Sequence, residues 1–206
     1  MTQPAADPTR SHARTLVLLS LAAFASAANL RICDSLLPQI AGQFSVTVGS
    51  ASMVVTAFAI SYGVAQIVVG PLGDARGKIF MVAMGSLWAG AASAIAAASP
   101  DLGFLIFLRL LAGAGAAAVI PIAIAWVGDV VPYEQRQPVL ARFLSGQIMG
   151  IVFGQAVGGI LGDAVGWRGT MLLVGCLHVG AGILLWLDRR RGGGQGQLPA
   201  GEARWR

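Results

Sequence analysis

The chain has 206 residues, of which 56 % are hydrophobic and 11 % are charged, and its mean hydropathy is +0.73. Soluble domains carry about 25 % charged residues, so this composition excludes a soluble globular domain and indicates a polytopic membrane protein. The formal net charge of +5 does not indicate nucleic-acid binding, because the basic residues lie at the ends of apolar runs and in the terminal tails.

Six apolar runs are separated by short polar segments, and each run is close to the roughly 20 residues that a helix needs to cross a bilayer. We expect six spans: 15–38, 48–70, 79–98, 103–127, 139–161 and 168–187. The predicted transmembrane domain is therefore 15–187, between a polar tail (1–14) and a basic tail (188–206) for which we expect disorder. The first run continues to Ile40, which favours a membrane helix over a signal peptide.

Positive charges concentrate on one side of this topology. With the N-terminus in the cytoplasm, eleven of the fourteen Lys and Arg residues lie on the cytoplasmic side, Arg168 lies outside, and Arg31 and Arg109 lie within spans. Cytoplasmic loops of membrane proteins carry an excess of Lys and Arg. We therefore expect both termini in the cytoplasm.

A charged, glycine-rich segment, GPLGDARGK (70–78), joins the second and third runs and is predicted to be a tight turn. A related sequence, GILGDAVGWR (159–168), follows the fifth run on the opposite side. Six-helix halves of secondary transporters contain two inverted three-helix repeats. The pattern predicts an all-α, six-helix membrane bundle of this kind; chance similarity between glycine-rich sequences is the alternative.

Three charged residues fall inside predicted spans and are the candidates for substrate binding and proton coupling. Such a charge costs ~2.5–3.5 kcal/mol on insertion scales. Arg31 and Asp34 are three residues apart and share a helical face, and Arg109 is expected at a similar depth in the outer half of the bilayer. Asp34 would be the protonatable group, with an arginine as its partner. The alternative is that Arg31 and Asp34 only neutralise each other.

Polar and small residues within the spans complete the candidate set. Four could line a polar cavity or make hydrogen bonds between helices: Tyr62, Gln66, Gln147 and Gln155. Glycines recur about every four residues in the fifth span and predict close helix packing: Gly146, Gly150, Gly154, Gly158 and Gly159.

The sequence contains no metal-ligand spacing, nucleophile elbow or phosphate-binding loop. We therefore expect neither enzymatic catalysis nor a metal site nor a cofactor. Cys33, Cys176 and His178 fall singly in apolar runs and are expected to pack within the bundle.

These motifs together resemble the N-terminal half of a major facilitator superfamily transporter of the drug- or sugar-efflux kind. The family has a signature loop between spans two and three that acts as a gating element. This chain resembles that loop at Gly70, Leu72, Asp74, Gly77 and Lys78. Ala75 stands where the family usually has arginine, and Arg76 follows it.

Later spans extend the resemblance. The span-four motif, whose arginine the family links to proton coupling, is matched by Arg109, Gly113 and Gly115, and the loop after it by Asp129, Pro132 and Arg136. The antiporter motif of span five is matched by Gly150, Gly154, Gly158 and Gly159, although Gln155 replaces its usual proline.

The resemblance implies a secondary active transporter in the plasma membrane, the inner membrane of a bacterium. It would export a small molecule by alternating access, driven by protons. The other expected partners are the lipid bilayer and a second six-helix half, on the same or another chain. Nucleic acid is not an expected partner. The alternative is a truncated or stand-alone half without transport activity, acting as a membrane interaction module or forming homodimers.

Overall fold

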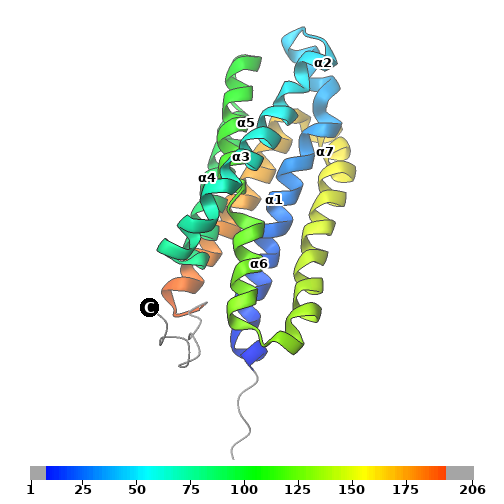
Figure 1. Cartoon of the computed structure of the whole chain (residues 1–206). Coiled ribbons are helices and arrows are strands. Elements are labelled where there is room, and N and C mark those ends of the chain that lie inside the picture. Colours follow the sequence, from blue (N-terminus) through cyan, green and yellow to red (C-terminus); the bar gives the residue numbers. More distant parts are fainter. Residues whose placement is uncertain (1–7, 194–206) are drawn as a thin grey trace, which may run out of the picture.

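The computed structural model describes residues 8–193, and these form a bundle of helices without strands. In chain order the helices are α1 (Pro8–Phe44), α2 (Val48–Ala51), α3 (Met53–Arg76), α4 (Lys78–Ala96), α5 (Leu102–Ala116), α6 (Val119–Val130) and α7 (Tyr133–Arg190). The all-α prediction is confirmed. The start of α1 and the end of α7 lie at the same end of the bundle (Figure 1). The predicted disorder falls mainly on residues 194–206, which lie outside the described residues.

Five helical stretches in the described part are long and apolar enough to cross a membrane: His12–Phe44, Val48–Arg76, Lys78–Ala96, Leu102–Val130 and Tyr133–Arg190. The last stretch is α7, whose 58 residues would measure about 87 Å if straight, far more than a ~30 Å hydrocarbon core. It is not straight, because Gly166 has φ 72° and ψ 167° and interrupts the helix. The first arm of α7 (133–165) and its second arm (167–190) run in opposite directions (Figure 1).

The helices extend beyond the apolar runs from which they were predicted. α1 includes residues 8–14 of the predicted polar tail. The predicted turn over residues 70–78 is wrong for most of its length, because α3 continues to Arg76 and only Gly77 leaves the helical conformation. Gly73 packs against Ile122 of α6 within the helical part of this segment, and Asp74 at the end of α3 pairs with Lys78 at the start of α4, across the break at Gly77.

The two related segments reverse the chain at matching glycines. Gly77 has φ 93° and Gly166 has φ 72°, and both positions are followed at once by a new helical segment. With ψ values of 125° and 167°, these are conformations that residues with a Cβ atom rarely adopt. The recurrence of GD-x-x-G in the sequence therefore corresponds to two equivalent helix reversals.

Arg168 joins the second reversal to the end of α4. Its guanidinium donates through Nη1 to the carbonyl of Ala97 at 2.7 Å and through Nη2 to that of Ser99 at 2.9 Å. It also lies 4.5 Å from the ring centroid of Trp167. A basic residue at this end of the bundle thus satisfies carbonyl groups that the end of α4 leaves open.

α1 and the first arm of α7 pack backbone to backbone. A Cβ atom added to glycines of this arm would press into α1, in pairs that advance by four residues along both helices: Gly146 with Ser20, Gly150 with Phe24, Gly154 with Ala28, Gly158 with Ile32 and Gly162 with Leu36. Because the pairs advance in the same direction, the two helices run parallel. The second arm approaches α4 in the same close manner, at Gly90 and Gly175.

We predict that Gly166→Ala destabilises the protein although no atom lies within 4 Å of the added Cβ. The positive φ alone should cost on the order of 1–3 kcal/mol, which a lower unfolding midpoint of the purified protein in detergent would report. Gly180→Ala is the matched control, because Gly180 also lies in α7 with open space around it but carries no positive φ. Equal midpoints for the two variants would contradict the assignment of strain to Gly166.

Candidate functional site

Arg109 of α5 carries a positive charge into the interior of the bundle, where its side chain is fully buried. Its guanidinium donates from Nη1 to Asn29 Oδ1 at 2.8 Å and from Nη2 to the Asn29 carbonyl at 3.0 Å. Nε lies 3.4 Å from the carbonyl oxygen of Val54. The guanidinium carbon lies 4.2 Å from the ring centroid of Phe58. Within the described part of the chain, neutral oxygens and an aromatic ring hold this cation, and no carboxylate pairs with it.

The side-chain amide of Asn29 connects Arg109 to two further helices. Its Nδ2 donates to Ser93 Oγ at 2.8 Å, and the Ser93 hydroxyl lies 3.0 Å from Asn29 Oδ1. The same Nδ2 lies 3.4 Å from Nδ1 of His178, and all four residues are fully buried. We call Arg109, Asn29, Ser93 and His178 the central polar network; it joins α5, α1, α4 and the second arm of α7.

The central polar network has one open position. His178 Nε2 is buried and has no hydrogen-bond partner among the described residues. Removing a partner from a buried polar group costs ~1–3 kcal/mol, and more when the group is charged, so the bonds that are present strongly restrain the four helices. A cation that is solvated only by amide and carbonyl dipoles also remains attractive to any anion that comes close.

Arg31 and Asp34 form a separate ion pair on α1. Arg31 Nη1 lies 3.3 Å from Asp34 Oδ2, and the two side chains are 43 % and 29 % exposed. Arg31 Nε, in contrast, is buried and has no hydrogen-bond partner within residues 8–193, and Arg31 Cβ lies beside Gly154 of α7. The structure therefore brings Arg31 and Asp34 together on a partly open face and gives Arg109 different partners.

The four candidate cavity residues lie in different environments. The ring of Tyr62 stacks on Phe58 with centroids 6.3 Å apart, which places it beside the aromatic ring that covers Arg109. Gln66 and Gln155 are exposed, and Gln147 is half-buried. Of these four, Tyr62 lies against Phe58, whose ring contacts Arg109.

The signature segment forms a second cluster of charges, at the end of the bundle near both chain ends. Lys78 Nζ pairs with Asp74 Oδ1 at 3.2 Å and with Oδ2 of Asp129, the latter at the end of α6. The other signature residues of this segment are exposed: Gly70, Arg76 and Gly77. Lys78 thus ties the end of α3 and the start of α4 to α6.

The helix-packing candidates divide into two groups. Gly150, Gly154 and Gly158 face the backbone of α1 so closely that a Cβ would not fit without a shift. Gly159 has room, because the nearest atom to an added Cβ is Ser35 Cβ at 3.8 Å.

Sequence reasoning missed Asn29 and Ser93, and it placed His178 in the bundle without assigning it a polar partner. One signal was available for Asn29: it is the single asparagine of the chain and lies within an apolar run, two residues before Arg31. Ser93 gave no such signal, because serine is frequent among the small residues of these spans.

A family model described as Major Facilitator Superfamily matches residues 19–206. An uncharacterized MFS-type transporter of Bacillus subtilis, YwfA, is 28 % identical over 79 % of this chain and 40 % of its own length. A chloramphenicol resistance protein of Streptomyces lividans is 30 % identical over 82 % of this chain and 44 % of its own length. A lincomycin resistance protein of Streptomyces lincolnensis is 28 % identical over 84 % of this chain and 36 % of its own length.

The fold also matches solved structures. A bacterial homologue of the human lysosomal transporter Spinster, in an inward-facing and occupied conformation, superposes with a TM-score of 0.78 at 18 % identity. The match covers 96 % of this chain and 46 % of the solved one. The chain thus spans less than half the length of these relatives.

We predict that Asn29→Leu lowers the unfolding midpoint strongly, because it removes the amide oxygen that accepts from Arg109. Hydrogen bonds to charged groups contribute ~1.5–3 kcal/mol. Asn29→Asp keeps an acceptor at this position and adds an opposite charge, so it should retain most of the stability. Thermal unfolding of both variants in detergent tests this, and an Asp variant as unstable as the Leu variant would contradict it.

A second prediction compares two buried serines of α4. Ser93→Ala should destabilise by about 0.5–1.5 kcal/mol, because Ser93 bonds to Asn29. Ser86→Ala is the control: Ser86 is equally buried, but its hydroxyl has no partner among the described residues, so its loss should be neutral or stabilising. The difference between their unfolding midpoints is the measurement, and a larger loss for Ser86→Ala would refute the role of Ser93.

Proposed function

The chain belongs to the Major Facilitator Superfamily, and from this we propose that it acts in secondary active transport, exporting a small molecule across the plasma membrane in exchange for protons. The export direction is supported by relatives named for resistance to chloramphenicol and to lincomycin. These two antibiotics are the first substrates to test.

The observation that carries the proposal is the presence of charged side chains within membrane-crossing helices. Ionisable residues at such positions are expensive and mark substrate or proton pathways by default. Arg109 is fully buried, whereas Arg31 and Asp34 form a partly exposed pair on α1. A partly exposed pair can exchange partners with water or substrate, which a fully buried, hydrogen-bonded group cannot do without opening the bundle.

We infer a mechanism of alternating access in which protonation of Asp34 breaks its ion pair. Neutral Asp34 no longer holds Arg31, so the guanidinium becomes free for another partner and the preference between the inward-open and outward-open states changes. Arg31 is the supported partner because it is the one in contact with Asp34. Arg109, held by Asn29, would supply a constant positive charge in the interior.

We further propose six membrane crossings, with α7 supplying two of them on either side of Gly166. The matching reversals at Gly77 and Gly166 support two inverted three-helix repeats. The excess of basic residues on one side supports cytoplasmic termini. A second six-helix half, on the same or another chain, would cover the face that carries Arg31 and Asp34, since exposure of this pair to lipid is costly.

We predict that Asp34→Asn abolishes proton-driven export while Asp34→Glu retains part of it. The measurement is uptake of labelled chloramphenicol or lincomycin into everted membrane vesicles that contain the protein, with and without an imposed proton gradient. Glu134→Gln is the control, because Glu134 is an exposed acid in the first turn of α7. Proton-dependent transport that persists in Asp34→Asn would show the mechanism to be wrong. Absence of gradient-driven transport in the wild type would favour the non-transporting alternative.

A further inference from the structure

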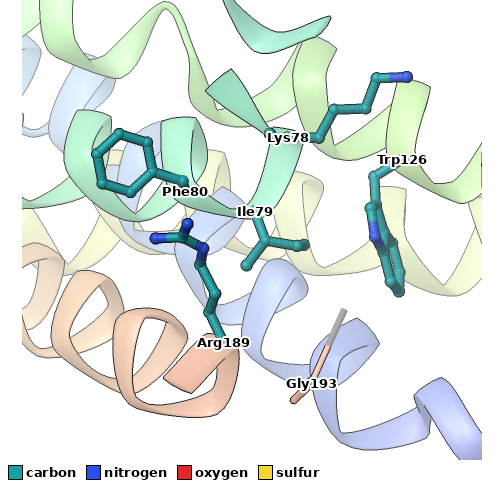
Figure 2. A pocket seen from close by; sticks show the side chains of 7 residues that line it. Lys78, Ile79, Phe80, Trp126, Arg189 and Gly193 are labelled. Atoms are coloured by element: carbon teal, nitrogen blue, oxygen red, sulfur yellow. The ribbon is translucent and has the colours of Figure 1, made fainter. Parts of the chain in front are cut away.

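A cavity of about 270 Å³ opens at the end of the bundle where both chain ends lie. It lies between the start of α4, the end of α6 and the end of α7, and its lining residues are Gly77, Lys78, Ile79, Phe80, Trp126, Arg189 and Gly193 (Figure 2). The intramembrane charges Arg31, Asp34 and Arg109 are not among them. This site is therefore separate from the one proposed for transport.

Arg189 brings an uncompensated positive charge to the rim of the cavity. Its guanidinium lies 4.8 Å from the ring centroid of Phe80, and Figure 2 shows it beside that ring at the edge of the opening. No carboxylate of residues 8–193 forms an ion pair with Arg189. Two further arginines, Arg190 and Arg191, follow it directly and are exposed.

The acidic groups near the cavity already have partners. Asp188 is buried, pairs with Arg14 Nε at 3.1 Å and accepts from Thr15 Oγ1 at 2.7 Å. Asp74 and Asp129 share the ammonium group of Lys78, which points away from the cavity in Figure 2. These carboxylates therefore do not neutralise Arg189, and the rim retains positive charge for an external anion.

The walls of the cavity are apolar and lie at the depth of a membrane surface. Phe80 is half-buried, and Ile79 and Trp126 are 4 % and 3 % exposed, so together they supply a small aliphatic and aromatic surface. One stretch with membrane-spanning character begins at Lys78 and another ends at Arg190, so the cavity lies where hydrocarbon gives way to headgroups. The first turn of α4 contains no acidic residue and no side-chain cap, so its amide groups add partial positive charge.

We propose that this cavity binds an anionic phospholipid of the leaflet that faces the chain ends. The headgroup phosphate pairs with Arg189 near the start of α4, and an acyl chain lies against Phe80 and the small exposed parts of Ile79 and Trp126. Basic pockets between membrane helices bind anionic headgroups by this combination of charge and apolar contact. A bound lipid would bridge α4, α6 and α7 at the end of the bundle.

Quenching of Trp126 by brominated lipid tests the proposal on the full chain. The protein is reconstituted in vesicles of unbrominated phosphatidylcholine. A lipid with dibrominated acyl chains, either phosphatidylglycerol or phosphatidylcholine, is then added in increasing fractions. Subtracting the signal of Trp126→Phe isolates Trp126 from the other tryptophans. We expect half-maximal quenching at an about fivefold lower fraction of the phosphatidylglycerol, equivalent to ~1 kcal/mol for one basic residue at the surface.

Three variants identify the group responsible. In Arg189→Gln, half-maximal quenching should require as large a fraction of phosphatidylglycerol as of phosphatidylcholine. Arg189→Lys keeps the charge and should retain the preference for phosphatidylglycerol. Arg142→Gln is the control for overall charge, because Arg142 is exposed on the first arm of α7 and does not line the cavity, and it should leave the preference unchanged. Equal quenching by both lipids in the wild type would overturn the proposal. This is the result expected if residues 194–206 occupied the cavity in place of a lipid. An equal loss in Arg142→Gln and Arg189→Gln would also overturn it.

Discussion

The close approach of α1 to the first arm of α7 is the constraint on which the rest of the bundle depends. In a membrane, helices gain little from the hydrophobic effect on association, and van der Waals contact between small residues takes its place. Four glycines of α7, spaced four residues apart, bring its backbone against that of α1, and Gly162 continues the contact against side chains. This contact occupies one side of α1 and leaves Asn29, next to the contact residue Ala28, to face α4 and α5.

The position of α1 in turn explains how a cation can be buried in the bundle. Arg109 donates to both the side chain and the backbone of Asn29, and Ser93 hydrogen-bonds to the same side-chain amide. Each bond requires α1, α4 and α5 to hold their relative positions within a few tenths of an ångström. The cation is therefore part of the architecture, and its energetic cost is offset by a network that also specifies how the helices pack.

The structure treats its other membrane charges differently. Arg31 and Asp34 are only partly buried and bind each other across one helical turn, so breaking their contact does not require helices to separate. At the end of the bundle, Lys78 is shared by two carboxylates, whereas Arg189 lies beside the ring of Phe80 and pairs with no carboxylate of residues 8–193. The described part of the chain thus contains a buried, hydrogen-bonded cation in its centre, a partly exposed ion pair on α1, and at the end of the bundle a cation without a carboxylate partner.

The sequence by itself determined the class of protein, the approximate positions of the long apolar helices, the glycine stripe and the occurrence of Arg31, Asp34 and Arg109 within apolar runs. These features depend on local hydropathy and on helical period, which a single stretch of chain displays. Only the tertiary structure decided that residues 70–76 are helical, because in it Gly73 packs against Ile122 of α6. It also decided that Arg109 binds Asn29, because the members of that network are 64, 80 and 149 residues away from Asn29 along the chain. Contacts at such separations depend on how helices pack, and periodicity within one helix carries no information about its neighbours.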